Sequence, residues 1–185
     1  DTIMDNTAKL GLRYHNIRHV HSMYQFLEDS YTPYSKALDY AVLFHDYVYD
    51  ANPYKEERSA LEMFRILKDE GVSNTIIDEA ISLILATKDH KIVLGNTNEI
   101  AIIKADLHEL TTQSTAERNY TSILIESANL YNLPIREIQK ANSNFMTGLI
   151  ATMWYNVHTK LEATDFFEKV IKGIEYTIEL GKKPI

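Results

Sequence analysis

The sequence of 185 residues contains no cysteine. Disulfides, thiolate nucleophiles and zinc sites with thiolate ligands are therefore excluded, and this absence agrees with the cytoplasm, where we expect the protein to act. No apolar run approaches the length of a membrane span, so we expect no membrane partner. Basic residues are in the minority, and the formal net charge is −7. This argues against a nucleic acid as partner, because binding its phosphates requires a basic surface.

Glycine and proline are scarce, with six and four residues in the whole chain. Between them, apolar residues recur at spacings of three and four, which is typical of helices, and no β-rich region competes. We predict an all-α fold, in which residues 1–185 form a single compact helical bundle of about seven to nine helices. The polar stretch Thr87–Asn98, which contains His90, is predicted to be a solvated loop. A final amphipathic helix is expected from Glu162 to Leu180. Its apolar stripe can close the core or pair two protomers, so a homo-oligomer is left open; the stripe consists of Phe166, Val170, Ile174 and Ile178.

Histidine is concentrated in the first part of the chain, and only His158 lies beyond residue 110. His45 and Asp46 follow the apolar run Tyr40–Phe44, so they are expected at the C-terminal end of a buried helix. A buried imidazole beside a buried carboxylate needs a partner or a cation to offset its desolvation. For an isolated His-Asp pair, a structural hydrogen bond without a metal is the favoured interpretation.

The surroundings of the pair change this interpretation. The segment Tyr14–His19 reads YHNIRH, and the spacing of His15 and His19 predicts that both lie on one helical face. Asp106 lies in a further predicted helix. With these residues the chain resembles the HD superfamily of metal-dependent phosphohydrolases, in particular a small bacterial and phage-type branch with a YHNxxH opening. The resemblance extends from about residue 14 to residue 180, and it implies an HD-type helical domain.

The resemblance also implies roles for individual residues. The metal ligands of the family correspond to His19, His45, Asp46 and Asp106. His90, at the end of the segment TKDH, corresponds to a histidine that faces the metal cleft, and a contact with a second metal or with phosphate is expected of it. The later family motif usually has two aspartates; here Lys104 stands in place of the first, which leaves the ligand at Asp106 intact.

Two imidazoles and two carboxylates suit a divalent metal ion such as Mn²⁺, Fe²⁺, Co²⁺, Ni²⁺ or Zn²⁺, and Mg²⁺ is also left open. Water bound to such an ion can have a pKa of about 7, and the ion also neutralises charge on a phosphoryl oxygen. Glu56 or Glu57 can act as the catalytic acid or base, and we prefer Glu56. The alternative, of equal weight, is that these acids only stabilise the start of a helix.

Substrate binding is assigned to Arg18 and Lys88, because an acidic protein must supply local positive charge where an anion binds. Arg13 and Lys91 are further candidates, and ordinary surface solvation is the alternative for each cation. His15 is expected to contact the substrate or to support the ligands from behind, not to bind the metal. We therefore expect a metal-dependent phosphohydrolase that cleaves a phosphate ester or anhydride of a small molecule, a nucleotide. The alternatives are a nucleotide-binding or regulatory HD module without turnover, and a helical protein whose His-Asp pair is only structural.

Overall fold

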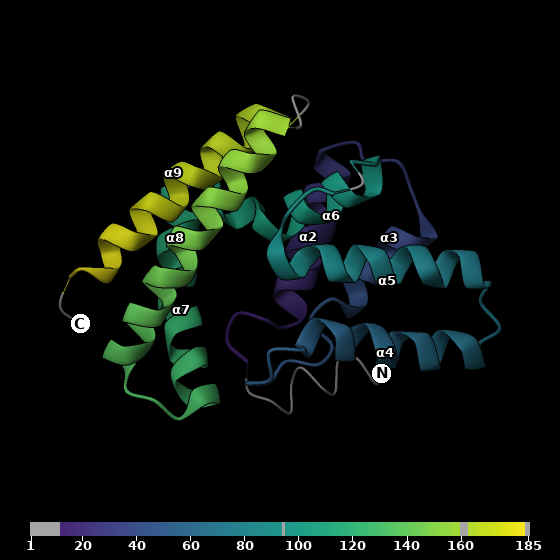
Figure 1. The fold of residues 1–185 in the computed structure, drawn as a ribbon, viewed down its shortest axis with the longest axis horizontal. Coiled ribbons are helices and arrows are strands. Elements are labelled where there is room, and N and C mark those ends of the chain that lie inside the picture. Colours follow the sequence, from purple (N-terminus) through teal and green to yellow (C-terminus); the bar gives the residue numbers. More distant parts are fainter. Residues whose placement is uncertain (1–11, 94, 160–162, 184–185) are drawn as a thin grey trace. The chain divides into compact units, whose positions relative to one another are not determined.

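The computed structural model describes residues 12–93, 95–159 and 163–183, and within these ranges every regular element is a helix (Figure 1). The predicted all-α bundle of about seven to nine helices is confirmed, since the described residues form eight α-helices. In chain order these are α2 (Ile17–Asp29), α3 (Lys36–Phe44), α4 (Lys55–Asp69), α5 (Asn74–Asp89), α6 (Thr97–Leu107), α7 (Gln113–Tyr131), α8 (Ile135–Thr159) and α9 (Thr164–Gly181).

The chain divides into two compact units, Asp1–Asp106 and Leu107–Ile185. The first unit holds α2 to α5 and nearly all of α6, together with every residue that the sequence assigned to a metal, to catalysis or to the substrate. The second unit holds a short 3-10 helix, His108–Leu110, and α7 to α9. The prediction of a single domain over residues 1–185 stays a prediction.

In the first unit, α5 packs against both α3 and α4, and α3 also contacts α2 and α4. Figure 1 shows α4 and α5 side by side and antiparallel. Each of these four helices has one apolar stripe, and burying the stripes against one another forms the core. Fully buried members of this core include Met23, Ala41, Met63, Ile77 and Ile84.

Two helix ends differ from the prediction, and both concern site residues. The side chain of Asn16 accepts a hydrogen bond from the backbone N–H of Arg18 at 2.9 Å, so α2 begins only at Ile17. The prediction that His15 and His19 share a helical face is therefore wrong, because His15 precedes the helix. The segment from Thr87 was predicted to be a loop, but α5 continues to Asp89 and ends at His90 in the left-handed conformation, with φ 53°.

In the second unit, α8 packs along α9, and α7 contacts both helices. The predicted start of the last helix, Glu162, lies outside the described residues. The predicted apolar stripe is confirmed at Val170 and Ile174, which are buried. Its ends are wrong by one position, since Phe167 and Thr177 are buried while their neighbours Phe166 and Ile178 are only partly so.

No described helix of either unit is both long enough and apolar enough to cross a membrane.

Candidate metal centre

Three side chains from three different elements converge in the first unit. His19 of α2, His45 at the end of α3 and Asp106 near the end of α6 each offer one ligand atom, and these atoms lie within 4.8 Å of one another. Both imidazoles are buried, with 3% and 2% of their surfaces exposed. Imidazole nitrogens and a carboxylate oxygen are donors that first-row divalent metals accept. This buried cluster can therefore hold a metal ion.

His19 is buried because of its place in α2. It shares the inner face of that helix with Val20, Met23 and Leu27, which pack into the core. Its Nε2 lies 3.0 Å from Oδ1 of Asp106, a residue distant in the sequence. The apolar stripe of α2 thus carries a polar group into the interior, where Asp106 satisfies it.

The tautomer of His45 follows from its contact with the backbone. Nδ1 of His45 lies 2.9 Å from the carbonyl oxygen of Val42. A carbonyl can only accept, so Nδ1 carries the proton and the Nε2 of the neutral ring is left with a free electron pair. This Nε2 is buried and has no hydrogen-bond partner among the residues that the structure describes. Metal-ligating histidines are commonly oriented by such a backbone contact.

Two carboxylates lie close to the His45 Nε2. Oδ2 of Asp46 is 3.1 Å away and Oδ1 of Asp106 is 3.8 Å away. Oxygens and an unprotonated nitrogen repel one another unless a proton or a metal lies between them. Burial lowers the pKa of His45, but Asp46 and Asp106 outweigh it, so the pKa is raised from the ordinary value of 6.5. The arrangement therefore attracts a cation.

Asp106 links two imidazoles. While Oδ1 meets His19, Oδ2 lies 2.9 Å from Nε2 of His90. Burial raises the pKa of the Asp106 carboxyl, but hydrogen bonds from His19 and His90 and the charge of His45 hold it well below its usual range. The sequence placed His90 in a solvated loop, whereas the end of α5 directs it onto this carboxylate.

Asp46 is the fourth predicted ligand, and its contact with the cluster is the one between its Oδ2 and the Nε2 of His45. Burial raises the pKa of its carboxyl, and the charges of His45 and His15 lower it further than burial raises it, so Asp46 is ionised. A small pocket beside it, with room for about one water molecule, is lined by Asp46, His19, His15, Leu43 and Tyr47, among others.

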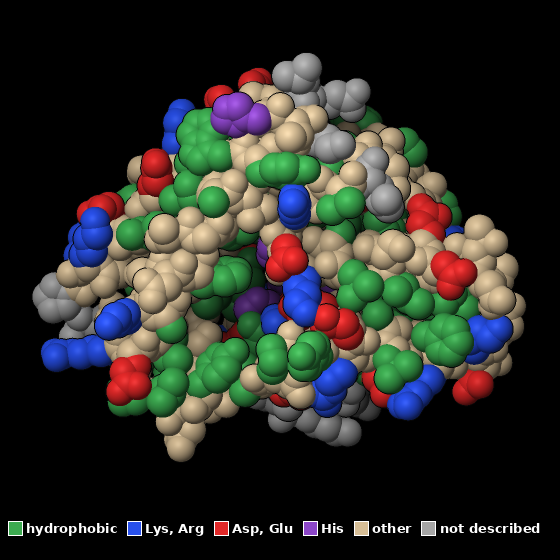
Figure 2. All heavy atoms as spheres, in the orientation of Figure 1, with side chains coloured by type: hydrophobic (Ala, Val, Ile, Leu, Met, Phe, Trp, Pro, Cys, Tyr) green, Lys and Arg blue, Asp and Glu red, His purple; other side chains and the backbone are tan. Residues whose placement is uncertain are grey.

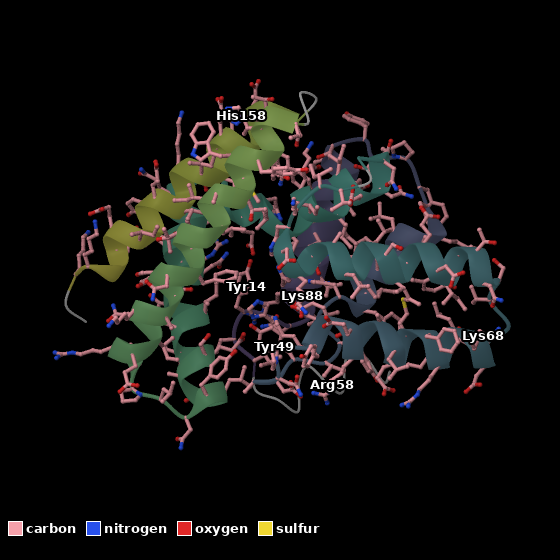
Figure 3. The ribbon with its side chains drawn as sticks, viewed as in Figure 1. Tyr14, Tyr49, Arg58, Lys68, Lys88 and His158 are labelled. Atoms are coloured by element: carbon pink, nitrogen blue, oxygen red, sulfur yellow. The ribbon has the colours of Figure 1, made fainter. Side chains whose placement is uncertain are left out.

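The two candidate catalytic acids at the start of α4 have different surroundings. Glu56 is buried, with 7% of its surface exposed, and its Oε1 lies 3.4 Å from Nζ of Lys55. Glu57 is partly exposed and accepts a hydrogen bond from Lys88 at 2.5 Å, which lowers the pKa of the Glu57 carboxyl. Figure 3 shows Lys88 at the end of α5 that lies beside the start of α4. Lys88, a predicted substrate-binding residue, is therefore occupied by an acid.

The other two predicted substrate-binding residues, His15 and Arg18, lie in different surroundings. His15 lies in the turn before α2, where its ring stacks on Tyr49 at a centroid distance of 4.1 Å and its Nε2 lies 3.3 Å from the Tyr49 hydroxyl. His15 lines the pocket beside Asp46. Arg18, by contrast, is exposed on the first turn of α2. The structure thus brings His15 to the cluster and leaves Arg18 at the surface.

Sequence reasoning missed Lys55 and Tyr49. Nζ of Lys55 lies 4.2 Å from the centre of the Tyr49 ring, a cation–π contact. Burial lowers the pKa of the Lys55 ammonium, but the charges of Asp46, Glu56 and Asp106 raise it more, so Lys55 is charged. One signal was available in the sequence: a lysine at the first position of a helix opposes the helix dipole, so it calls for a local partner.

Comparison of the chain with protein-family models, with curated proteins and with solved structures finds no match in any of the three.

Proposed function

We propose that this chain is a metal-dependent phosphohydrolase. The observation that carries the proposal is the buried Nε2 of His45, which lies beside the carboxylates of Asp46 and Asp106 and, within the described part of the chain, has a free electron pair and no hydrogen-bond partner. With the neutral ring and no metal, this buried atom would stay unsatisfied, which is costly. The resemblance of the sequence to the HD superfamily points to the same residues.

Four residues would hold the metal: His19, His45 and Asp106 as the converging donors, and Asp46 beside them. When bound, such an ion supplies a water of lowered pKa and neutralises charge on a phosphoryl oxygen. The donors match the sequence-based expectation of a divalent ion such as Mn²⁺, Fe²⁺, Co²⁺, Ni²⁺ or Zn²⁺. His90 contacts the second oxygen of Asp106 and so keeps that carboxylate in place.

The remaining roles belong to the chain itself. Val42 holds the His45 ring in one tautomer through its carbonyl oxygen. Glu56 is buried near the cluster and is suited to exchange a proton with the attacking water or the leaving oxygen, whereas Glu57 is committed to Lys88. The proposed substrate is a small-molecule nucleotide, in which a phosphate ester or anhydride bond is cleaved.

The test combines metal analysis with activity. Protein purified without added ions is analysed for metal, titrated with Mn²⁺, and assayed on a panel of nucleotides with Mn²⁺ or Co²⁺. His45→Ala and Asp106→Ala are expected to weaken Mn²⁺ binding by more than about 100-fold and to abolish hydrolysis. Asp46→Ala is expected to behave in the same way. His21→Ala is the matched control, because His21 is exposed on the same helix as His19.

Circular dichroism separates loss of the site from loss of the fold, since all variants are expected to remain helical. Full metal affinity in both His45→Ala and Asp106→Ala would show that the cluster is structural. Bound metal without turnover of any phosphate compound would support the alternative, a nucleotide-binding or regulatory module.

A further inference from the structure

The cations that the sequence offered for phosphate binding are not the ones that lie in the cluster. Lys88 is paired with Glu57, and Arg18 is exposed. The charges that act on Lys88 are those of Glu57, Glu56 and Asp89. Figure 2 shows acidic and basic side chains next to one another over α4 and α5, so this face carries no excess of positive charge that would attract an anion. A phosphoryl group at the metal centre therefore needs another cation.

Lys55 is placed to be that cation. It is the first residue of α4, its Nζ lies 4.2 Å from the centre of the Tyr49 ring and 3.4 Å from Glu56 Oε1, and the charges of Asp46 and Asp106 act on it. Tyr49 is itself buried and stacked on His15, which lines the pocket next to Asp46. The ammonium group thus rests on a ring that itself packs on His15, a residue of the pocket that His19 and Asp46 also line.

The charge balance explains why a cation belongs there. A divalent ion alone does not neutralise the three carboxylates that act on Lys55, namely those of Asp46, Glu56 and Asp106. With Lys55 included, the site is close to neutral, so an incoming phosphoryl anion meets no net negative charge. Without the positive charge of Lys55, the site would keep a net negative charge that repels an incoming anion.

We propose that Lys55 binds the phosphoryl group of the substrate. This inference rests on the proposed function, because it assumes a metal at the His19, His45 and Asp106 cluster. It adds a residue that neither the composition nor the motif of the sequence indicated. The alternative is that Lys55 only neutralises the nearby carboxylates. Its loss would then lower the stability of the folded protein without changing the affinity for phosphate.

The experiment uses inorganic phosphate as the probe and the full chain loaded with Mn²⁺. Mn²⁺ affinity is measured by titration, and phosphate binding is measured by the broadening of the ³¹P resonance by the bound Mn²⁺. The variants are Lys55→Gln, Lys55→Met, which keeps an apolar stem over Tyr49, and Lys55→Arg, which keeps the charge. Lys68→Gln is the control, because Lys68 lies at the other end of the same helix, where it contacts Asn74 (Figure 3).

Lys55→Gln and Lys55→Met are expected to weaken phosphate binding by about tenfold or more, as for the loss of a hydrogen bond to a charged group. Mn²⁺ affinity should be unchanged or tighter, Lys55→Arg should retain part of the phosphate affinity, and Lys68→Gln should match the wild type. Wild-type phosphate affinity in both uncharged variants, with Mn²⁺ bound, would overturn the role of Lys55 and leave the proposed function standing.

A different result would show that the proposed function fails while the role of Lys55 is still open to test. If the wild type binds no Mn²⁺, the metal centre is refuted, and phosphate binding by the metal-free protein, measured by calorimetry, then decides on Lys55. Phosphate binding that Lys55→Gln loses and Lys68→Gln keeps would still support Lys55. Equal binding in all variants, or none in any, would overturn it. If Lys55→Gln does not fold, Lys55→Met carries the comparison.

Discussion

His45 combines two constraints that together set its chemistry. Its Nδ1 donates to the carbonyl oxygen of Val42, and its Nε2 faces the carboxylates of Asp46 and Asp106 without a hydrogen bond. The first contact orients the ring. The negative charge of the two carboxylates favours the binding of a proton or a metal ion by Nε2. Protons and metal ions should therefore compete for this atom.

The competition predicts a pH dependence. Burial lowers the pKa of His45 and the carboxylates raise it more, so in the metal-free protein the net shift is upward from 6.5. A raised pKa in the folded state stabilises the metal-free protein below the unfolded value, and this contribution is lost as the pH rises through the folded value. Metal binding needs the unprotonated ring, so its affinity should rise over the same range.

The measurement is a set of thermal unfolding curves from about pH 5.5 to about pH 8, with and without Mn²⁺. We expect the increase in melting temperature caused by Mn²⁺ to grow with pH. An increase that is equal at all pH values would contradict a histidine ligand, and His21→Ala should follow the wild-type profile.

Glu56 and Glu57 are neighbours in the sequence, but their surroundings predict different effects of substitution. Glu56→Gln removes a buried carboxylate beside Lys55, and turnover should fall by about 10²–10⁴-fold with Mn²⁺ binding retained. Glu57→Gln removes a partly exposed partner of Lys88 and should cost only a few-fold in turnover. Steady-state kinetics on one phosphate substrate compare them; equal losses in both variants would exclude a special role of Glu56.

At the scale of single elements, a helix can approach the backbone of a neighbouring segment closely where it has a glycine, which lacks a side chain. Gly173 lies in the buried face of α9, and a Cβ added there would collide with the carbonyl oxygen of Leu110. Gly148 lies in α8, and a Cβ added there would meet nothing within 4 Å. The same substitution should therefore have opposite effects at these two positions.

Gly173→Ala is expected to destabilise the protein by about 1–3 kcal/mol, because backbone must shift to admit the methyl group. Gly148→Ala is expected to stabilise it by about 0.5–1 kcal/mol, because alanine favours the helix interior. Urea unfolding followed by circular dichroism measures both. An unchanged stability of Gly173→Ala would contradict the close packing of α9 against the backbone of Leu110.

Several elements could be predicted from the sequence because their signals are local. The buried run before His45 and the acids after Lys55 mark the end of α3 and the start of α4. The start of α2 was misplaced because Asn16 caps the helix through its own side chain, and the spacing of His15 and His19 does not reveal this. His90 was misplaced because its left-handed backbone allows α5 to end there and direct the ring inward.

For the whole molecule, all the proposed ligands lie in the first of the two units. A metal that binds only the folded state stabilises it, by about 2.7 kcal/mol when the free metal is on the order of 100 times its dissociation constant. This stabilisation should be concentrated in the helices that supply ligands.

Hydrogen exchange measured by mass spectrometry tests this. Addition of Mn²⁺ is expected to slow exchange in α2, α3 and α6, and in the end of α5 at His90, and to leave α8 and α9 less affected. Chelation should reverse the change, and Asp106→Ala should abolish it. Protection that appears in α8 and α9 and not in α2 or α3 would contradict the placement of the metal.

The sequence by itself determined that the chain is helical, because the apolar spacing and the scarcity of glycine and proline act locally, and it singled out His19, His45 and Asp106 as candidate ligands. Only the tertiary structure decided that these three meet, that the Nε2 of His45 has no hydrogen-bond partner in the described residues, and that the charges of Asp46 and Asp106 act on Lys55 rather than on Lys88. The reason is physical: such pairings depend on how separate helices pack, and side-chain spacing within one helix carries no information about them.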